Sequence, residues 1–325
     1  MKLFLRRLVY LFLLGISTFV IASACGQDVD RSIVNSNQTA NNCRIVQHAI
    51  GETCIPRNPQ RVITLRTDHL ANSLALDVQP IASVFVEGLT PPKSLQSKMD
   101  TIELVGAINN PNLEKISLLK PDLIISNSRL EMINERLSSI APTVILDLPY
   151  PPPSWKEQLV SLAKLLDQED NSQQLIDDYW QRIEKLKQAL GPRRNQIEVS
   201  VAGASSDEIW AYGEKHFPGQ VLNDIGLKRP SAQRGNFFYI SNISKEKISD
   251  IDGDILFFVS LGKEQDKEVL NKLTKDSLWQ NLKAVQNNQV FFVDGYWHDS
   301  AGIFAINAIL DDLEKYLVSM PQPNT

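Results

Sequence analysis

Aromatic and basic side chains gather in a few short segments of this 325-residue chain, several of them directly after apolar runs. Flat aromatic rings cover the apolar surface of a ligand, and arginine pairs with carboxylate or hydroxamate oxygens through two parallel hydrogen bonds. An ordinary core or surface ion-pair role is the alternative for each residue. The candidate ligand-binding residues are Arg66, Arg129, Trp210, Tyr212, Arg234, Phe238, Tyr239, Trp297 and His298.

Three of the four histidines, His69, His216 and His298, fall near these segments, so a direct metal or haem site is an alternative. No two of them have the spacing of ligands on one helix, and no carboxylate stands in an obvious ligand position beside all three. We therefore expect neither a metal site nor a resident cofactor.

Enzymatic motifs are missing from the sequence. It contains no Gly-x-Ser-x-Gly, no phosphate-binding loop and no helix with two zinc-binding histidines. We therefore expect a protein that is not an enzyme. A purely structural surface protein is the other alternative, and saturable ligand binding would distinguish the two.

The elements that position these residues alternate between short apolar runs and helical stretches. The runs cover residues 62–65, 81–86, 123–125, 144–146, 197–202, 255–259 and 290–293. This alternation predicts an α/β fold with parallel strand pairing. In open α/β sheets the ligand lies beyond the carboxyl ends of the strands, which is where most of the candidate residues stand.

The middle of the chain predicts a helical connection between two lobes. Three prolines, Pro151 to Pro153, close the first half, and helical patterns follow over 155–166 and 172–190 before Gly191-Pro192 ends them. The second pattern would span roughly 28 Å at 1.5 Å per residue, enough to pass from one lobe to another. We expect an N-terminal lobe over 43–153, linking helices over 154–191 and a C-terminal lobe over 192–325.

A short internal repeat supports two related lobes. Residues 114–125 read EKISLLKPDLII and residues 246–257 read EKISDIDGDILF. In both copies a short helix would turn at Pro or Gly and enter an apolar strand. Glu114 and Glu246 begin the two copies, and on the residues alone each is a solvated residue at a helix start.

The N-terminus has the composition of an export signal. A basic start precedes an apolar run that ends in small residues before Cys25, which predicts a signal peptide over 1–24 and a lipid-bearing Cys25. An uncleaved membrane helix is the alternative. Residues 26–42 are polar and without periodicity, so residues 25–42 are expected to form a flexible tether.

The other two cysteines, Cys43 and Cys54, are left as a pair in an exported chain, and a disulfide that staples a hairpin is expected. A zinc site with His48 is the alternative, although the neighbourhood offers no further ligands. Cleavage after residue 24 would remove three of the 33 basic residues and no acids, leaving 30 against 38 and a net charge of −8. Nucleic acid is therefore not an expected partner.

Several segments in order resemble the siderophore-binding members of the periplasmic binding proteins whose two Rossmann-like lobes are joined by one long helix. The likeness covers nearly all of residues 44–320. The segments are 46–53, 59–62, 112–114, 120–125, 209–213, 221–230 and 279–293.

The resemblance implies a lipid-anchored, periplasmic and monomeric component of an ABC importer. It would bind a ferric siderophore of the hydroxamate or citrate type and deliver it to a membrane permease. In this family a glutamate on each lobe is thought to meet arginine pockets on the permease, and Glu114 and Glu246 stand at the matching positions. A haem, cobalamin or metal-ion carrier of the same fold is the alternative.

Overall fold

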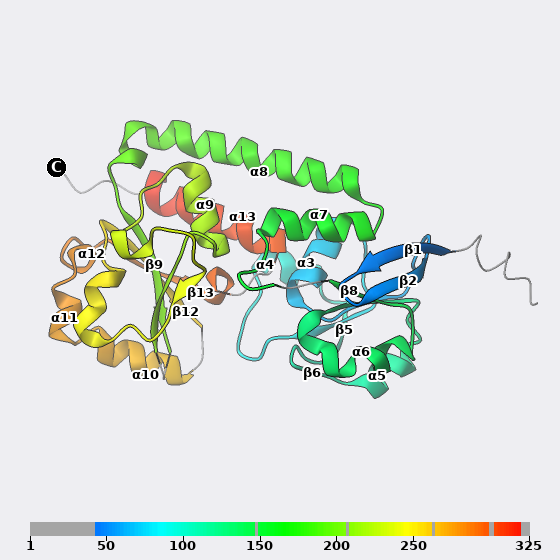
Figure 1. Ribbon diagram of the computed structural model, residues 1–325. Helices are drawn as coiled ribbons and strands as arrows, with labels where there is room; N and C mark the ends of the chain where they lie inside the picture. Colours follow the sequence, from blue (N-terminus) through cyan, green and yellow to red (C-terminus); the bar gives the residue numbers. More distant parts are fainter. Residues whose placement is uncertain (1–42, 147–148, 206–207, 262–263, 299–301, 320–325) are drawn as a thin grey trace, which may run out of the picture. The chain divides into compact units, whose positions relative to one another are not determined.

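Two separate β-sheets organise the chain, and helices pack against each of them (Figure 1). The structure is a computed structural model that describes residues 43–146, 149–205, 208–261, 264–298 and 302–319. The predicted signal segment 1–24, Cys25 and the whole predicted tether, 25–42, lie outside these ranges. Within the described ranges no helix is both long and apolar enough to cross a membrane.

The first sheet contains six strands in the order β6-β5-β4-β3-β7-β8. All neighbours pair in parallel except β5 with β6. The strands are β3 (Val62–Thr64), β4 (Ala82–Phe85), β5 (Glu103–Ala107), β6 (Asn110–Pro111), β7 (Leu123–Asn127) and β8 (Thr143–Leu146). The helices between them are α3 (Thr67–Ala75), α4 (Lys93–Gln96), α5 (Leu113–Leu118), η1 (Ser128–Leu130) and α6 (Glu131–Ser138). Strand β7 is buried along its whole length, because both faces of a parallel sheet are covered.

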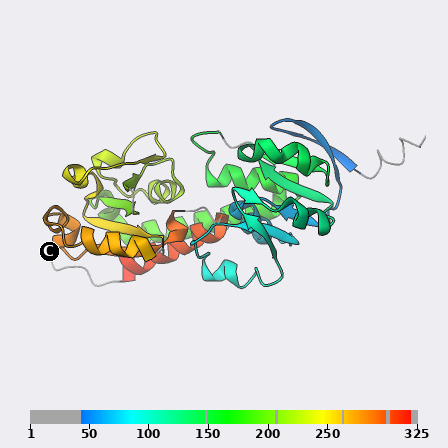
Figure 2. The ribbon, with the colours of Figure 1, turned by 90° about the horizontal axis from the view of Figure 1, so that it is seen from below.

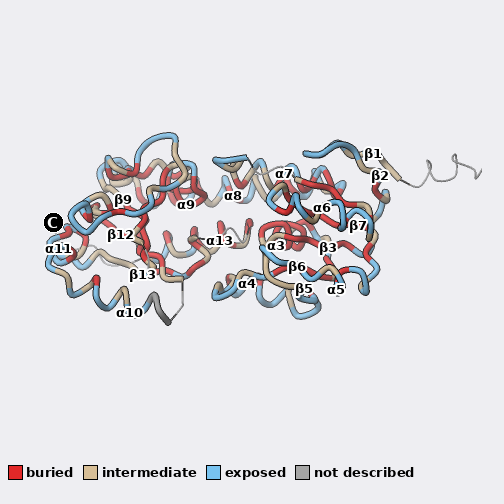
Figure 3. The backbone as a smooth tube through the Cα atoms, turned by 60° about the horizontal axis from the view of Figure 1, so that its bottom comes forward, coloured by how far each residue is buried: buried red, intermediate tan, exposed pale blue. Residues whose placement is uncertain are grey.

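The second sheet contains five strands in the order β11-β10-β9-β12-β13. Strands β9, β12 and β13 are parallel, whereas β10 pairs antiparallel with both β9 and β11. The strands are β9 (Val199–Ala204), β10 (Ile209–Tyr212), β11 (Tyr239–Ile240), β12 (Ile255–Ser260) and β13 (Val290–Asp294). Figure 3 shows β9 and β12 as buried, with the exposed surface on outer helices such as α10 and α11.

The helices of this half follow the same alternation of strand and helix. They are α9 (Phe217–Ile225), η3 (Ser231–Gln233), η4 (Lys245–Ile251), α10 (Glu264–Leu273), α11 (Ser277–Gln280), α12 (Lys283–Gln286), η5 (Gly295–Trp297), α13 (Gly302–Leu313) and the π-helix η6 (Glu314–Ser319). Helix α13 packs against α3 and α9, and the backbone N–H of Ile303 donates to the side-chain oxygen of Asn72 at 3.0 Å.

Two helices connect the sheets. Helix α7 (Trp155–Leu165) begins with a capping box in which Ser154 and Glu157 satisfy each other's backbone N–H groups. Helix α8 (Glu169–Leu190) has 22 residues, packs against α7, α9 and η6, and leads into the 3₁₀ turn η2 (Gly191–Asn195). At 1.5 Å per residue α8 is about 33 Å long. The predicted fold class, two Rossmann-like lobes joined by a single long helix, is confirmed.

A disulfide hairpin precedes the first sheet. Strands β1 (Cys43–His48) and β2 (Gly51–Pro56) form a separate two-stranded sheet, drawn in blue in Figure 2, and Cys43 and Cys54 are disulfide-bonded. The backbone N–H of Ala49 donates to the carbonyl oxygen of Ile145 at 3.1 Å. The predicted disulfide is therefore present, and the hairpin lies against strand β8.

Both copies of the internal repeat lead into a central strand of their sheet. The first copy forms α5 ahead of β7, and the second forms the 3₁₀ element η4 ahead of β12. Ile116 and Ile248, each two residues after the glutamate that begins its copy, are both buried. The repeat thus occupies equivalent places in the two lobes.

Candidate functional site

Arg66 follows β3 at the carboxyl edge of the first sheet, but its guanidinium group already has a partner. Its Nε and Nη2 donate to the two carboxylate oxygens of Asp68 at 2.7 and 2.6 Å. Burial alone would raise the pKa of Asp68, yet the charge and hydrogen bonds of Arg66 hold it below its usual value. Arg66 therefore neutralises a buried carboxylate, and little of its charge is left for a ligand.

Arg129 follows β7 at the same edge of the sheet and is exposed. It lines a surface pocket of about 440 Å³ together with Glu114 and Arg136. Its backbone N–H donates a hydrogen bond to the side-chain oxygen of Asn127 at 3.0 Å. The structure therefore brings one predicted ligand-binding residue and one predicted docking residue into the same pocket.

The second half of the chain carries a continuous cluster of aromatic rings. Ring centroids lie 5.4 Å apart for Trp210 and His298, 4.5 Å for Tyr212 and His216, and 4.4 Å for His216 and Phe238. Two further rings complete the cluster at its outer end: Tyr150 lies 6.0 Å and Tyr239 lies 5.8 Å from Phe238. We call the seven residues the aromatic cluster: Tyr150, Trp210, Tyr212, His216, Phe238, Tyr239 and His298.

The aromatic cluster has an exposed outer end and a buried inner end. Tyr150 and Tyr239 are 69% and 44% exposed, whereas Trp210, Tyr212 and His216 are buried. The indole of Trp210 lies directly on β9, because a Cβ added to Gly203 would stand 2.6 Å from the ring. The outer rings can therefore contact a ligand directly, and the inner rings fix their position.

The inner end of the aromatic cluster is held neutral. The hydroxyl of Tyr212 and Nδ1 of His298 share a hydrogen bond of 2.7 Å, and burial raises the pKa of Tyr212. Burial, with smaller effects of His298 and Arg229, lowers the pKa of His216 well below its usual value. At neutral pH Tyr212 and His216 are therefore uncharged.

Trp297 is directed away from the aromatic cluster. It is 0% exposed, stacks on Phe257 at 4.9 Å and donates its indole N–H to the carboxylate of Asp312 at 2.9 Å. The neighbouring Tyr296 donates its hydroxyl to the same carboxylate at 2.7 Å. The structure gives Trp297 a place in the core, in place of the predicted ligand contact, because it is fully buried, stacks on Phe257 and donates its N–H to Asp312.

Arg234 lies at the amino end of the second sheet. Its Nη2 contacts the carboxylate of Glu198 at 2.6 Å, and Glu198 stands immediately before β9. Its Nε donates to the carbonyl oxygen of Arg229 at 2.6 Å. The predicted ligand contact of Arg234 is corrected to an exposed ion pair, because ligands of such sheets lie at the opposite, carboxyl edge.

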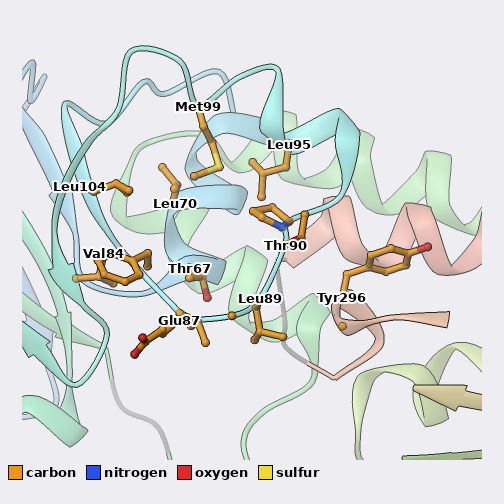
Figure 4. A pocket seen from close by; sticks show the side chains of 15 residues that line it. Thr67, Leu70, Val84, Glu87, Leu89, Thr90, Leu95, Met99, Leu104 and Tyr296 are labelled. Atoms are coloured by element: carbon orange, nitrogen blue, oxygen red, sulfur yellow. The ribbon is translucent and has the colours of Figure 1, made fainter. Parts of the chain in front are cut away.

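A pocket of about 390 Å³ lies at the carboxyl edge of the first sheet (Figure 4). Residues 84–91, at the end of β4 and in the loop after it, form one side, and Thr67 and Leu70 of α3 form another. Gly295 and Tyr296, from the turn after β13, also line it. In Figure 4, Leu70, Leu95 and Met99 lie next to one another at one end of the pocket.

Sequence reasoning missed Tyr150 and the loop over residues 86–91, and it weighed His216 as a metal or haem ligand and not as part of an aromatic cluster. The loop could have been found, because it directly follows the predicted run 81–86 and so belongs to the same strand-end positions as Arg66. The place of His216 beside Tyr212 could have been inferred, because it stands at the start of α9, four residues after Tyr212. Tyr150 had no local pattern, since its ring meets Phe238 across 88 residues of sequence.

The predicted docking residues Glu114 and Glu246 are both exposed, at the starts of α5 and η4. Hydrogen bonds to the backbone and to Ser244 lower the pKa of Glu246, so its carboxylate is charged at neutral pH. Among the described residues, no group of three or more His, Cys, Asp or Glu side chains is arranged to hold a metal ion.

Known proteins with similar sequences cover nearly the whole chain. The probable siderophore-binding lipoprotein YfiY of Bacillus subtilis is 35% identical over 96% of this chain and 97% of its own length. The achromobactin-binding periplasmic protein of Dickeya dadantii is 33% identical over 79% of this chain and 86% of its own length.

A solved structure has a similar fold. The structure of Staphylococcus aureus SirA complexed with staphyloferrin B superimposes with a TM-score of 0.73 at 28% identity, covering 84% of this chain and 98% of that one. A sequence model described as periplasmic binding protein matches residues 71–296. The chain belongs to the periplasmic binding protein family.

Proposed function

We propose that this protein is the substrate-binding component of an ABC importer and that it carries a ferric siderophore to the permease of that importer. The observation that supports this most strongly is that a relative aligned over nearly the whole chain is named as a siderophore-binding lipoprotein. A structure of the same fold contains staphyloferrin B, which agrees with it. On this proposal the protein binds and releases its ligand without chemical change.

The proposal includes the location of the protein in the cell. Residues 1–24 direct export, Cys25 carries the lipid and residues 25–42 tether the folded part to the membrane on the periplasmic side. Glu114 and Glu246 then meet basic pockets on the permease, because each is exposed at the start of an equivalent element of its lobe. The carrier works as a monomer.

The charge near the site favours a ferric siderophore of the hydroxamate or citrate type. A tris-catecholate carries several negative charges and is best held by a strongly basic pocket. Here Arg66 is neutralised by Asp68, and Arg234, paired with Glu198, lies at the other edge of its sheet, which leaves Arg129 as the remaining candidate arginine at a carboxyl edge. The uncharged aromatic cluster is better suited to cover a chelate that has little net charge.

Tryptophan fluorescence tests this function. The mature protein should lose fluorescence in a saturable manner when a ferric hydroxamate or ferric citrate-type siderophore is added, and much less with a ferric catecholate. The iron-free chelators serve as controls for inner-filter effects. Preference for the catecholate would contradict the ligand class, and tight binding of haem or cobalamin with no siderophore response would contradict the function.

A pair of phenylalanine variants locates the ligand. Phe238→Ala should weaken binding of the responsive siderophore about tenfold, because it removes a ring between the exposed and buried parts of the aromatic cluster. Phe292→Ala removes a half-exposed ring of β13 outside the cluster and should leave affinity unchanged. Equal effects of the two variants would place the ligand elsewhere.

A further inference from the structure

The pocket beside Tyr296 has walls whose chemistry does not suit a ferric chelate. Most of the side chains that line its volume of about 390 Å³ are apolar, among them Leu70, Val84, Leu89, Leu95, Met99 and Leu104. The outer surface of a hydroxamate or citrate chelate is rich in oxygen, and placing those oxygens against hydrocarbon without hydrogen bonds is unfavourable. The pocket therefore suits a part of the ligand that carries no polar atoms.

The polar atoms of the pocket are few. Among the described residues that line it, Glu87 is the only charged one. In Figure 4 the carboxylate of Glu87 points away from Leu70, Leu95 and Met99. An ammonium or carboxylate head group would therefore lack a partner deep in the pocket, which leaves an alkyl chain as the chemistry that fits.

Residues that line the pocket neighbour residues of the candidate site along the chain at two places. Thr67 lines the pocket and follows Arg66 directly, and Tyr296 lines it two residues before His298 of the aromatic cluster. The turn that carries Tyr296 packs closely on the loop over 86–91, because a Cβ added to Gly295 would stand 2.7 Å from Cδ2 of Leu89. This closeness along the chain is the ground for expecting that a ligand at the aromatic cluster extends a chain into the pocket.

We propose that the pocket takes the hydrocarbon chain of an acylated ferric chelate, so that the substrate is an amphiphilic siderophore. The inference rests on the proposed function, since the chelate supplies the atom to which the chain is attached. Burial of apolar surface favours the bound state by about a factor of four per methylene group. For a chain of medium length, most of the binding free energy would then come from burial of the chain in the pocket, while the chelate binds at the aromatic cluster.

A matched pair of chelates tests the inference. Two synthetic citrate dihydroxamates that differ only in one N-acyl group, acetyl in one and decanoyl in the other, are loaded with ferric iron and titrated into the full mature chain. The decanoyl chelate should bind at least about 100-fold more tightly than the acetyl chelate, even if only part of its chain is buried.

Variants of Leu104 connect this preference to the pocket. Leu104 is 43% exposed at the pocket, so Leu104→Trp adds volume there without entering the core. The ratio of the two affinities should fall below about tenfold in Leu104→Trp and also fall in Leu104→Gln, which replaces hydrocarbon with an amide of similar size. Leu118→Trp makes the same change at a 74% exposed position of α5 outside the pocket and should keep the wild-type ratio.

The outcomes separate the inference from the function on which it rests. Equal affinity for both chelates, or a ratio unchanged in both Leu104 variants, would overturn the inference and leave the proposed function intact. Free decanoate that binds as tightly as the decanoyl chelate would show a lipid site and would also overturn it. If neither chelate binds, the proposed function fails and the inference fails with it.

Discussion

At the scale of single residues, the two arginines Arg66 and Arg234 differ in what surrounds their ion pairs. The carboxylate that pairs with Arg66 is buried, with Asp68 1% exposed, whereas Arg234 and Glu198 are both largely in solvent. A buried charge that loses its partner is strongly destabilising, while an exposed pair contributes little.

The difference predicts unequal effects of the same substitution. Arg66→Met should lower the free energy of unfolding by about 3–5 kcal/mol, because Asp68 would remain buried without a counter-charge. Arg234→Met should lower it by less than about 1 kcal/mol. Urea unfolding of the two variants measures this directly, and a larger loss in Arg234→Met would contradict the ion-pair assignments.

His69 predicts a loss of stability in weak acid. It is buried, and burial lowers its pKa to about 4, while the unfolded chain takes up the same proton near pH 6.5. Neutral His69 therefore makes its full contribution to the free energy of unfolding above about pH 6.5. This contribution, up to roughly 3 kcal/mol, is lost progressively as the pH falls to about 4. His216 acts in the same direction.

The test compares the free energy of unfolding from pH 7 to pH 4 in the wild type and in His69→Gln. The variant should lose less stability across this range, because glutamine takes up no proton. His48→Gln, at a half-buried position of the hairpin where desolvation also lowers the pKa of the histidine, is the control and should stay closer to the wild-type slope than His69→Gln does. Parallel curves for the wild type and His69→Gln would refute the assignment.

The positions of some residues could not be predicted from the sequence. Arg234 and Trp297 both stand beside aromatic residues in the sequence, which made them good candidates for ligand contact. The neighbouring sequence does not determine which edge of the sheet Arg234 reaches, or which face of the turn Trp297 occupies. Those are decided by Glu198 and Asp312, partners far away in the sequence.

At the scale of elements, the disulfide hairpin is joined to the first sheet by few hydrogen bonds. The side chain of Thr53 donates to the carbonyl oxygen of Thr143 at 3.2 Å, and Ile55 is buried in the core. Ten residues separate the two cysteines. The disulfide thus constrains a short segment that the fold itself also fixes.

Replacing both Cys43 and Cys54 by serine should lower the free energy of unfolding by about 2 kcal/mol, near the low end of the usual range for a native disulfide. A reductant should have the same effect on the wild type and no further effect on the double variant. Thermal unfolding of both proteins with and without reductant measures this. A wild type that is insensitive to reductant would contradict a stabilising role.

The exposed positions of Glu114 and Glu246 predict that replacing both residues impairs transport and leaves ligand binding intact. The double variant Glu114→Ala, Glu246→Ala should bind the siderophore as the wild type does, while iron uptake in cells should fall at least about tenfold, because charge-assisted contacts at the permease are lost. Glu135 and Glu169 are also exposed glutamates, and their double alanine variant is the matched control. Normal uptake with Glu114 and Glu246 replaced would refute the docking role.

The elements themselves were largely predictable from the sequence. Apolar runs such as 123–125 and 255–259 lie in the buried strands β7 and β12, because a parallel strand covered on both faces must be apolar throughout. The long helix predicted over 172–190 is α8, which begins three residues earlier at Glu169. The antiparallel pairing of β10 with β9 was not predicted, since β10 has only four residues and so shows too short a pattern.

At the scale of the whole molecule, the family membership and the arrangement of the site support one account. Two lobes of equivalent construction each expose a glutamate at the start of the repeated element, and the structure contains a cluster of aromatic rings and an apolar pocket at the carboxyl edge of the first sheet. The fold class and the family were predictable from the order of motifs along the chain. The pocket was not, because its walls come from four separate segments of the sequence.

The most direct test of this account is the mass of the ligand that the protein carries in its own cells. The full-length protein, purified from its iron-starved host in mild detergent, is measured by native mass spectrometry before and after the ligand is released. The account predicts an added mass that equals one organic chelator with bound ferric iron and that disappears on release. An added mass equal to haem or cobalamin would contradict it.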